Sequence, residues 1–234
     1  MSGANANLGP LNILYEDNHC LAVAKPAPLL TQGPPGIPNL EAMVKAYVKE
    51  RYCKPGSVYL GIPHRLDRPV SGVVLFARNS KAARRLAEQF EARRVRKVYW
   101  AMVEGPVEPA EGRWDDWLVK LPEEARVERA EPGTPGARRA VLRYRRLEVG
   151  PDWTLLELVP ETGRTHQLRV QAAVRGWPIC GDGLYGSTRP FGPPAELPRD
   201  RVIALHARSL TFFHPIRYEP VTLTAPLPAF WQES

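Results

Sequence analysis

The sequence contains few cysteines and no long apolar segment. Three cysteines occur among its 234 residues, too few and too far apart for a disulfide framework or a C-x-x-C zinc site. No apolar run approaches the roughly 18 residues of a membrane helix. The first residues also lack the basic and then apolar order of a signal peptide. The cysteines are Cys20, Cys53 and Cys180. We therefore expect a soluble protein of the cytoplasm with reduced thiols.

Signals for nucleotide cofactors and for metals are also weak. The sequence has no Walker loop, which would cradle the phosphates of a nucleotide. Its histidines do not pair at the spacing of metal ligands. They are His19, His64, His166, His206 and His214. An isolated histidine is more often a structural residue than a ligand, so we expect neither a nucleotide cofactor nor a metal ion.

The charge balance, in contrast, is distinctly basic. Lysine and arginine total 32 against 25 aspartates and glutamates, which gives a net charge of +7. Arginine accounts for most of these cations, and it binds phosphate bidentately and stacks on bases. The composition therefore favours a nucleic-acid partner. An arginine-rich proteome would produce the same composition without such a partner.

The cations gather in two places along the chain. Residues 78–97 carry eight cations and two carboxylates, and residues 138–146 carry five arginines. Runs of like charge are usually solvated faces. Two runs that hold most of the excess charge also predict an electrostatic footprint for a polyanion.

The pattern of apolar residues predicts more strands than helices. We expect helices at 39–51, after a cap at Asn79 or Ser80, and at 165–175 with Thr162 or Thr165 as the cap. Strands are expected at 11–15, 20–24, 72–77, 98–103, 114–119, 139–148, 153–159, 204–213 and 221–224. Because strands and helices do not alternate, we predict an α+β fold with a mostly antiparallel mixed sheet and flanking helices. Residues 1–10 read as a flexible tail, and 11–234 as a single domain.

Two polar segments set between apolar ones are the candidates for chemistry. The first, residues 63–72, places Asp67 between Arg65 and Arg68 at the mouth of a buried strand, where positive charge stabilises an ionised carboxylate. The second, residues 161–169, is rich in arginine and opens a helix. Each segment, taken from its residues alone, is also compatible with an ordinary surface loop.

Two pairs of adjacent carboxylates suggest a different chemistry. They are Asp115–Asp116 and Glu123–Glu124. Adjacent side chains point apart on an extended chain, whereas a glycosidase needs two carboxylates that face one another. This pattern therefore argues against a glycosidase.

Five segments in order along the chain resemble one enzyme family. They are ILYEDNHCLAVAKPAPLL, HRLDRPVSGVVLFA, the Arg96–Tyr99 strand, ETGRTHQLRV with GWPICGDGLYG, and LHARSLTFFHP. Together they resemble the RluA-type pseudouridine synthases. Val70 and Gln171 depart from the family pattern, in which threonine and histidine are frequent at those places. Neither position is one to which we assign chemistry.

This resemblance implies a catalytic domain of the pseudouridine synthase type and a cofactor-free isomerisation of uridine in ribosomal or transfer RNA. The implied catalytic residues are Asp67, Tyr99, which stacks on the uracil, and Arg169, which pairs with Asp67. Asp67 acts either as a nucleophile on the anomeric carbon or as a base toward a glycal, and both routes stay open. The implied substrate-binding residues are Arg65, Leu168, Arg164, His166 and His64. The uridine is expected to flip out of its RNA stem to reach them.

Two other function classes compete with this interpretation. A non-catalytic RNA-binding module would keep the fold without needing Asp67 and Tyr99, but both residues are present. A DNA-binding protein would need a basic recognition helix over 80–97. We expect a monomer with RNA as its partner and no membrane contact. Only about ten residues precede the first motif, so RNA binding is expected to fall on the catalytic domain itself.

Overall fold

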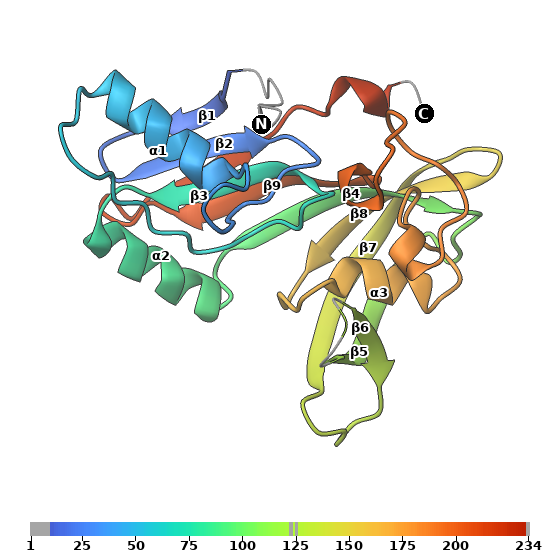
Figure 1. Ribbon diagram of the computed structural model, residues 1–234. Helices are drawn as coiled ribbons and strands as arrows, with labels where there is room; N and C mark the ends of the chain where they lie inside the picture. The colour runs from blue at the N-terminus through green and yellow to red at the C-terminus, as the bar shows by residue number, and fades with distance from the viewer. Residues whose placement is uncertain (1–9, 122–123, 125, 233–234) are drawn as a thin grey trace. The chain divides into compact units, whose positions relative to one another are not determined.

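The computed structural model describes residues 10–121, 124 and 126–232 (Figure 1). The chain divides into two compact units, one ending at Val95 and resuming over Ser209–Pro228, the other covering Arg96–Arg208 and the residues from Ala229 on. The flexible tail predicted at 1–10 lies, apart from Pro10, outside the described residues. Among the described helices, none is long and apolar enough to cross a membrane.

The first unit consists of a sheet with one helix on each face (Figure 1). The helices are α1 (Leu40–Arg51) and α2 (Ser80–Glu91). Strand β2 pairs antiparallel with β1 and with β3, and β10 pairs antiparallel with β9. These strands are β1 (Asn12–Glu16), β2 (Cys20–Lys25), β3 (Ser71–Ala77), β10 (Pro220–Thr224) and the part of β9 (Leu205–Phe213) that begins at Ser209.

The core of the first unit explains its unbroken apolar strands. All seven residues of β3 are buried, as expected of a strand covered on both faces. One core cluster joins Ala82 and Leu86 of α2 to alternate residues of the sheet, including Val73, Leu75 and Phe212. Both helices begin where an asparagine side chain accepts a hydrogen bond from the third following backbone N–H. The N-caps are Asn39 and Asn79, so the helix starts predicted there are confirmed.

The second unit is an antiparallel sheet with a short helix packed on it. Its strands run in the order β4-β8-β7-β5-β6. They are β4 (Arg96–Glu104), β5 (Glu111–Lys120), β6 (Val127–Ala130), β7 (Arg138–Val149) and β8 (Trp153–Pro160), with the first residues of β9. Helix α3 (Gln167–Ala173) packs Val170 against Leu118, Val127 and Ala140 of this sheet. Three short 3-10 helices follow, η1 (Gly183–Tyr185), η2 (Pro198–Asp200) and η3 (Ala229–Trp231).

The predicted α+β class with a mostly antiparallel sheet is confirmed. The neighbouring strands β1–β2, β2–β3, β4–β8, β5–β7 and β7–β8 pair antiparallel, and strands do not alternate with helices along the chain. The sequence pattern missed β6, because only Val127 of its four residues is buried. The predicted start of the third helix, at residue 165, was also wrong, because the helix begins at Gln167. Helix α3 follows His166, which has a left-handed backbone (φ 50°) and makes no capping hydrogen bond within the described chain.

Thr162 explains why the predicted cap fails. Its hydroxyl oxygen accepts a hydrogen bond from the backbone N–H of Val141 in β7 at 2.8 Å. It also lies 2.7 Å from the side-chain oxygen of Gln167. The hydroxyl is therefore used to fasten the loop to β7 rather than to cap α3.

Candidate active site

The backbone around Asp67 is held by the neighbouring loop of the first unit. The hydroxyl of Thr31 donates to the carbonyl oxygen of Leu66 at 2.9 Å and accepts from its N–H at 3.0 Å. A turn follows, in which the N–H of Val70 donates to the carbonyl oxygen of Asp67 at 3.1 Å. Asp67 itself is half-buried. The loop therefore presents its carboxylate from a fixed backbone, as preorganised catalytic groups require.

A buried lysine supports the same loop from the end of β2. The ammonium of Lys25 donates hydrogen bonds to the carbonyl oxygens of Pro26, Leu29 and Arg68, at 3.1, 2.6 and 3.3 Å. Lys25 is only 1% exposed. Burial lowers the pKa of Lys25 to about 7, and the negative charge of Asp67 opposes that shift. Lys25 therefore interacts electrostatically with Asp67, and its hydrogen bond holds the backbone of Arg68, the residue after Asp67.

His64 and Arg65, earlier in the loop, differ in their surroundings. The Nε2 atom of His64 accepts a hydrogen bond from the N–H of Leu75 at 2.9 Å. Its ring stacks on Phe90 of α2, with 4.8 Å between centroids. Arg65 is exposed and forms no ion pair with any residue that the structure describes. The contacts of His64 therefore favour support of the loop, whereas Arg65 is open to a ligand.

In the second unit, Arg169 of α3 is buried in a bidentate ion pair. Its Nε and Nη2 atoms donate to the two carboxylate oxygens of Asp182 at 2.6 and 2.7 Å. The guanidinium carbon also lies 4.9 Å from the ring centroid of Tyr185. The two side chains of the pair are 6% and 2% exposed. This arrangement fixes the orientation of the guanidinium, since a bidentate pair constrains its plane.

Tyr185 connects this ion pair to His166. Its hydroxyl lies 2.7 Å from Nδ1 of His166 and accepts a hydrogen bond from the N–H of Val127 at 3.0 Å. Arg164, two residues earlier, donates from Nε to the carbonyl oxygen of Arg139 at 3.0 Å. The predicted residues His166 and Arg169 are thus brought together through a tyrosine that the motif reasoning did not select.

Tyr99 and Leu168 lie elsewhere in the second unit. Tyr99 is a half-buried residue of β4, opposite Leu158 of β8. Leu168 is 7% exposed in the first turn of α3. Asp67 belongs to the first unit and Arg169 to the second. The pairing expected between them therefore stays a prediction.

Sequence reasoning missed four supporting residues, namely Lys25, Thr31, Asp182 and Tyr185. One signal for Lys25 was available, because it directly follows the apolar run of β2 and precedes a proline. Asp182 and Tyr185 lie in the quoted GWPICGDGLYG segment, but nothing local assigns them partners. Thr31 has no sequence signal, since its contact with Leu66 spans 35 positions.

The motif reasoning counted no G-x-G-x-x-G pattern, and this was wrong, because residues 181–186 match the spacing of such a dinucleotide-binding loop. That motif requires a preceding strand and a following helix whose N-terminus binds pyrophosphate. Here the segment forms the three-residue helix η1. The carboxylate of Asp182 within it is engaged by Arg169. The local structure therefore does not fit a nucleotide cofactor.

The adjacent carboxylates of β5 point to opposite faces, as expected. Asp116 is 4% exposed and accepts from Gln171 of α3 at 2.7 Å. Asp115 lies on the exposed face and pairs with Arg139. Glu123, from the second pair, lies outside the described residues. The β5 carboxylates therefore do not form a facing pair.

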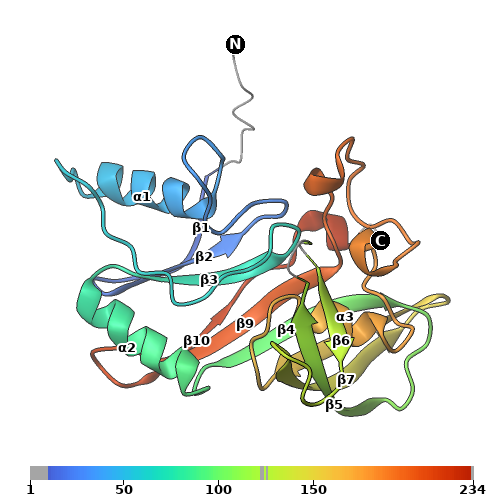
Figure 2. The same cartoon turned by 60° about the horizontal axis from the view of Figure 1, so that its bottom comes forward.

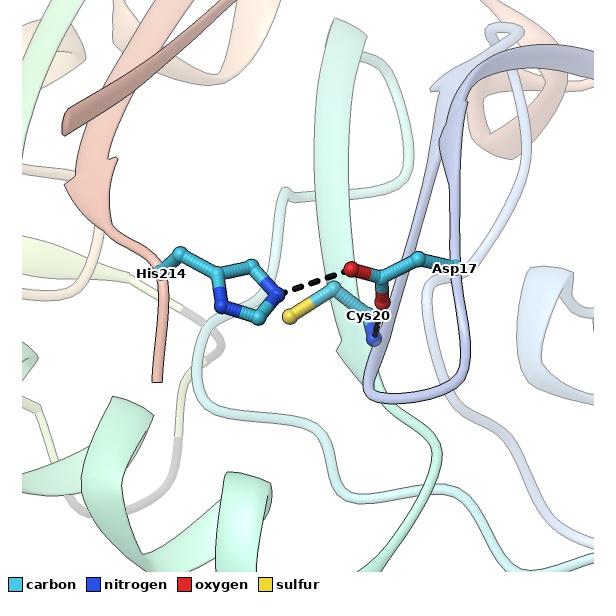
Figure 3. A group of neighbouring side chains, drawn as sticks. All are labelled: Asp17, Cys20 and His214. Atoms are coloured by element: carbon cyan, nitrogen blue, oxygen red, sulfur yellow. Dashed lines mark hydrogen bonds and ion pairs between the residues drawn. The ribbon is translucent and has the colours of Figure 1, made fainter. Parts of the chain in front are cut away.

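Within the described residues, one group of potential metal ligands lies close together (Figure 3). It comprises Asp17, Cys20 and His214 of the first unit. The Nδ1 atom of His214 accepts from the N–H groups of Ile216 and Arg217, at 3.2 and 2.9 Å. Its Nε2 atom therefore carries the proton and donates to Asp17 at 2.8 Å. Both ring nitrogens are thus occupied by hydrogen bonds.

Of the other two side chains, the Cys20 thiol disfavours a metal, and the Asp17 carboxylate is ionised but its oxygens already accept hydrogen bonds. Burial raises the pKa of Cys20 to about 12, whereas metals bind the thiolate. Burial would also raise the pKa of Asp17, but hydrogen bonds from the N–H groups of His19 and Cys20 lower it well below its usual range. The group therefore fits a structural role, in which hydrogen bonds join the turn between β1 and β2 to the turn after β9.

The arginines of β7 are largely paired with carboxylates. Arg143 contacts Glu161 at 2.9 Å, and Arg145 contacts Glu157 at 3.2 Å. Two further pairs are Arg139 with Asp115 and Arg146 with Glu108. Their charge is therefore mostly compensated within the sheet, which argues against β7 as the main phosphate-binding surface.

The cations around α2 are compensated far less. Arg93, Arg94 and Arg96 are exposed, and no carboxylate of the described chain lies within 4.0 Å of them. The helix ends at Glu91 and the chain continues as β4 from Arg96. Residues 80–97 therefore do not form the continuous recognition helix that a DNA-binding protein would need. Their excess positive charge remains available to a polyanion.

Comparisons with known proteins agree with this geometry. A model of the RNA pseudouridylate synthase family matches residues 19–174. Ribosomal large subunit pseudouridine synthase D of Xanthomonas campestris pv. campestris is 39% identical over 225 residues, which cover 94% of this chain and 66% of that protein. An RNA pseudouridine synthase of Zymomonas mobilis is 38% identical over 218 residues, covering 92% of this chain and 93% of the relative.

The fold is also similar to that of a solved structure, human RNA pseudouridylate synthase domain containing 4. The TM-score is 0.77 at 26% identity, over 94% of this chain and 90% of the human chain. The chain spans about two thirds of the length of several curated relatives it matches. The resemblance predicted from the sequence motifs is confirmed: the chain belongs to the RNA pseudouridylate synthase family, an enzyme family of isomerases.

Proposed function

We propose that this protein converts a uridine of ribosomal or transfer RNA to pseudouridine, with Asp67 as the catalytic carboxylate. The observation that carries the proposal is the loop of Asp67, which is held by Thr31 and by the buried ammonium of Lys25. The family supports the reaction class. The name of the Xanthomonas relative, which refers to the large ribosomal subunit, supports ribosomal RNA as one substrate.

The reaction exchanges one bond of the ribose for another. The bond from the anomeric carbon to N1 of uracil breaks, the uracil turns, and the same carbon bonds to C5. The proton of C5 then leaves, and N1 ends the reaction protonated. Asp67 either attacks the anomeric carbon or removes a proton from the ribose to give a glycal, and its fixed backbone serves both routes.

Two cations stabilise the ionised form of Asp67 in this proposal. Lys25 lies in the same unit as Asp67 and interacts electrostatically with the carboxylate. Arg169 supplies the second charge from α3. Its contact with Asp182 engages two of the five guanidinium N–H groups. Asp182 fixes the plane of the guanidinium that this proposal pairs with Asp67.

The substrate side of the site is assigned to five residues. Tyr99 stacks on the uracil, and Leu168 forms the opposite apolar wall. A uridine in a stem reaches them only by flipping out, and exposed Arg65 enters the gap that it leaves. Arg164 and His166 contact the backbone or a base. His64, also expected to touch substrate, acts in this proposal mainly as the support of the Asp67 loop.

The experiment that tests the proposal maps pseudouridine in total RNA from three strains and one control strain. One lacks the gene, one expresses the wild type, and one expresses Asp67→Asn. We expect wild type to restore at least one pseudouridine that Asp67→Asn does not restore. Asp152→Asn, whose side chain is 65% exposed in the second unit, is the matched control and should behave as wild type. Turnover by Asp67→Asn would refute the role of Asp67, and a wild type without turnover would refute the function.

Cytoplasmic location and a monomeric state complete the proposal. All three cysteines are free thiols. Burial raises the pKa of Cys180, as of Cys20, to about 12, which keeps both unreactive toward oxidation. A reducing compartment fits these thiols. Light scattering of the purified chain tests the monomer.

A further inference from the structure

The first unit carries a groove whose lining includes no residue of the Asp67 loop. The groove has a volume of about 510 Å³ and runs between α2 and the turn that joins β9 to β10. Figure 2 shows this helix beside that turn. The residues that line the groove are Arg85, Glu88, Gln89, Arg94, Phe213, Pro215 and Tyr218. The catalytic proposal does not use this surface, although Phe213 and Pro215 belong to the last of the five family-like segments.

Hydrogen bonds between helix and turn hold the groove in shape. The side-chain amide of Gln89 donates to the carbonyl oxygen of Phe213 and accepts from its N–H, both at 2.8 Å. Nη1 of Arg85 donates to the carbonyl oxygen of Pro215 at 2.7 Å. The guanidinium carbon of Arg85 lies 5.2 Å from the ring centroid of Tyr218. The groove is therefore a preformed surface rather than a gap between loosely placed loops.

Two aromatic rings of the groove are open to solvent. Tyr218 is 62% exposed and Phe213 is 46% exposed. Tyr218 also has a left-handed backbone, with φ of 62°. Glycine is favoured in this conformation, and a bulky side chain there costs stability. An exposed ring at a position that is both strained and solvated contributes little to folding, so its place is explained better by a ligand.

The charge of the groove favours an anionic ligand. Arg94 has no carboxylate partner within 4.0 Å in the described chain, and the same is true of Arg93 beside it. The one carboxylate that lines the groove, Glu88, lies 4.0 Å from Arg84. Outside the lining, Arg217 of the turn pairs with Glu219 and with Asp17. Unpaired arginine beside exposed aromatic rings is the composition of a surface that binds single-stranded nucleic acid.

We propose that this groove binds an unpaired base and its phosphate from a single-stranded segment of the RNA substrate, outside the reacting uridine. The base stacks on Tyr218 and Phe213, and Arg94 contacts the phosphate. This inference rests on the proposed function, because the ligand is the same RNA. Helix α2 links the groove to the loop of Asp67, since Gln89 lines the groove and the next residue, Phe90, stacks on His64 of that loop.

The test measures binding of a fluorescein-labelled oligoadenylate of about 12 nucleotides, which contains no uridine and so does not engage the reaction. Tyr218→Gly removes the ring and relieves the left-handed strain, so the variant should fold at least as stably as wild type. We expect its Kd to rise at least about fivefold, with an unchanged salt dependence. Tyr218→Phe keeps the ring and should bind within about twofold of wild type. Arg94→Gln should reduce the salt slope by about 0.7.

Tyr59→Gly is the matched control, because Tyr59 is 53% exposed in the same unit but does not line the groove. Equal affinity of wild type and Tyr218→Gly would overturn the proposal, as would an equal loss in Tyr59→Gly. A groove built for a protein partner would also leave oligoadenylate binding unchanged, which counts against the proposal. A wild type that makes no pseudouridine refutes the proposed function alone, because the binding comparison does not depend on turnover.

Discussion

The buried ammonium of Lys25 donates a hydrogen bond to the carbonyl oxygen of Arg68, the residue that follows Asp67. Forty-three positions separate the two residues. The contact joins the end of β2 to the loop of Asp67 and places a lysine of shifted pKa within the electrostatic range of Asp67. The first two predictions follow from this relationship.

Removal of the Asp67 charge should change the titration of Lys25. The pKa of Lys25 is about 7 because burial lowers it against the opposing effect of Asp67. Asp67→Asn keeps the size of the side chain and removes its charge, so the pKa of Lys25 should fall below 7. Carbon-13 NMR of labelled lysine Cε atoms measures this titration. Exposed Glu50→Gln serves as control, and an identical Lys25 titration in wild type and Asp67→Asn would contradict the coupling.

Stability should rise with pH because of the same lysine. Its folded pKa of about 7 lies below the ordinary value of 10.5. Between these values the unfolded state binds a proton that the folded state does not, so the free energy of unfolding increases with pH in this window. Below it both states are protonated and the contribution is flat. Urea denaturation of wild type and Lys25→Met checks this, since the variant should lack that part of the slope.

Asp182→Asn should destabilise the protein markedly. Arg169 and Asp182 are both almost fully buried, and loss of the carboxylate leaves a buried guanidinium without its bidentate partner. We expect the free energy of unfolding to fall by about 3 kcal/mol. Denaturant titration measures the change. Asp115→Asn breaks the exposed pair with Arg139 and should cost much less, so similar losses in both variants would argue against a special role of the buried pair.

Tyr99→Phe should separate stacking from proton transfer. The variant keeps the ring and loses the hydroxyl, which we expect to assist removal of the C5 proton. Single-turnover rates at saturating RNA should fall by about a hundredfold, with little change in affinity. Tyr59→Phe, at an exposed position, provides the comparison. An unchanged rate would restrict Tyr99 to stacking.

The two arginine clusters should differ in their effect on RNA binding. Arg93→Ala with Arg94→Ala removes two cations that lack carboxylate partners in the described chain. The affinity for RNA should fall, and the salt slope should decrease by about 0.7 for each phosphate that the variant no longer binds. Arg143→Ala with Arg145→Ala removes cations already paired with Glu161 and Glu157. That double variant should keep nearly the wild-type salt slope. Titrations at several salt concentrations measure this, because plots of log affinity against log salt concentration should run parallel for this variant and wild type and diverge for Arg93→Ala with Arg94→Ala.

The local pattern of the sequence was sufficient for most of the secondary structure and for the family. Asn39 and Asn79 mark helix starts because an asparagine cap acts within three residues of itself. The strands follow from short apolar runs for the same local reason. The motif segments named the family, since their order along the chain is itself sequence information. The short polar strand β6 was missed because it lacks such a run.

Only the tertiary structure decided which charged side chains are paired within the protein and which are exposed without a carboxylate partner. Lys25 and Arg169 are buried through contacts with Arg68 and Asp182, and nothing local predicts those partners. The arginines of β7 are neutralised by the register of neighbouring strands, which sets Arg145 directly opposite Glu157. Charge compensation depends on which residues the fold brings within a few ångströms. The sequence therefore determined the family and its candidate residues, whereas the fold determined the electrostatics around them.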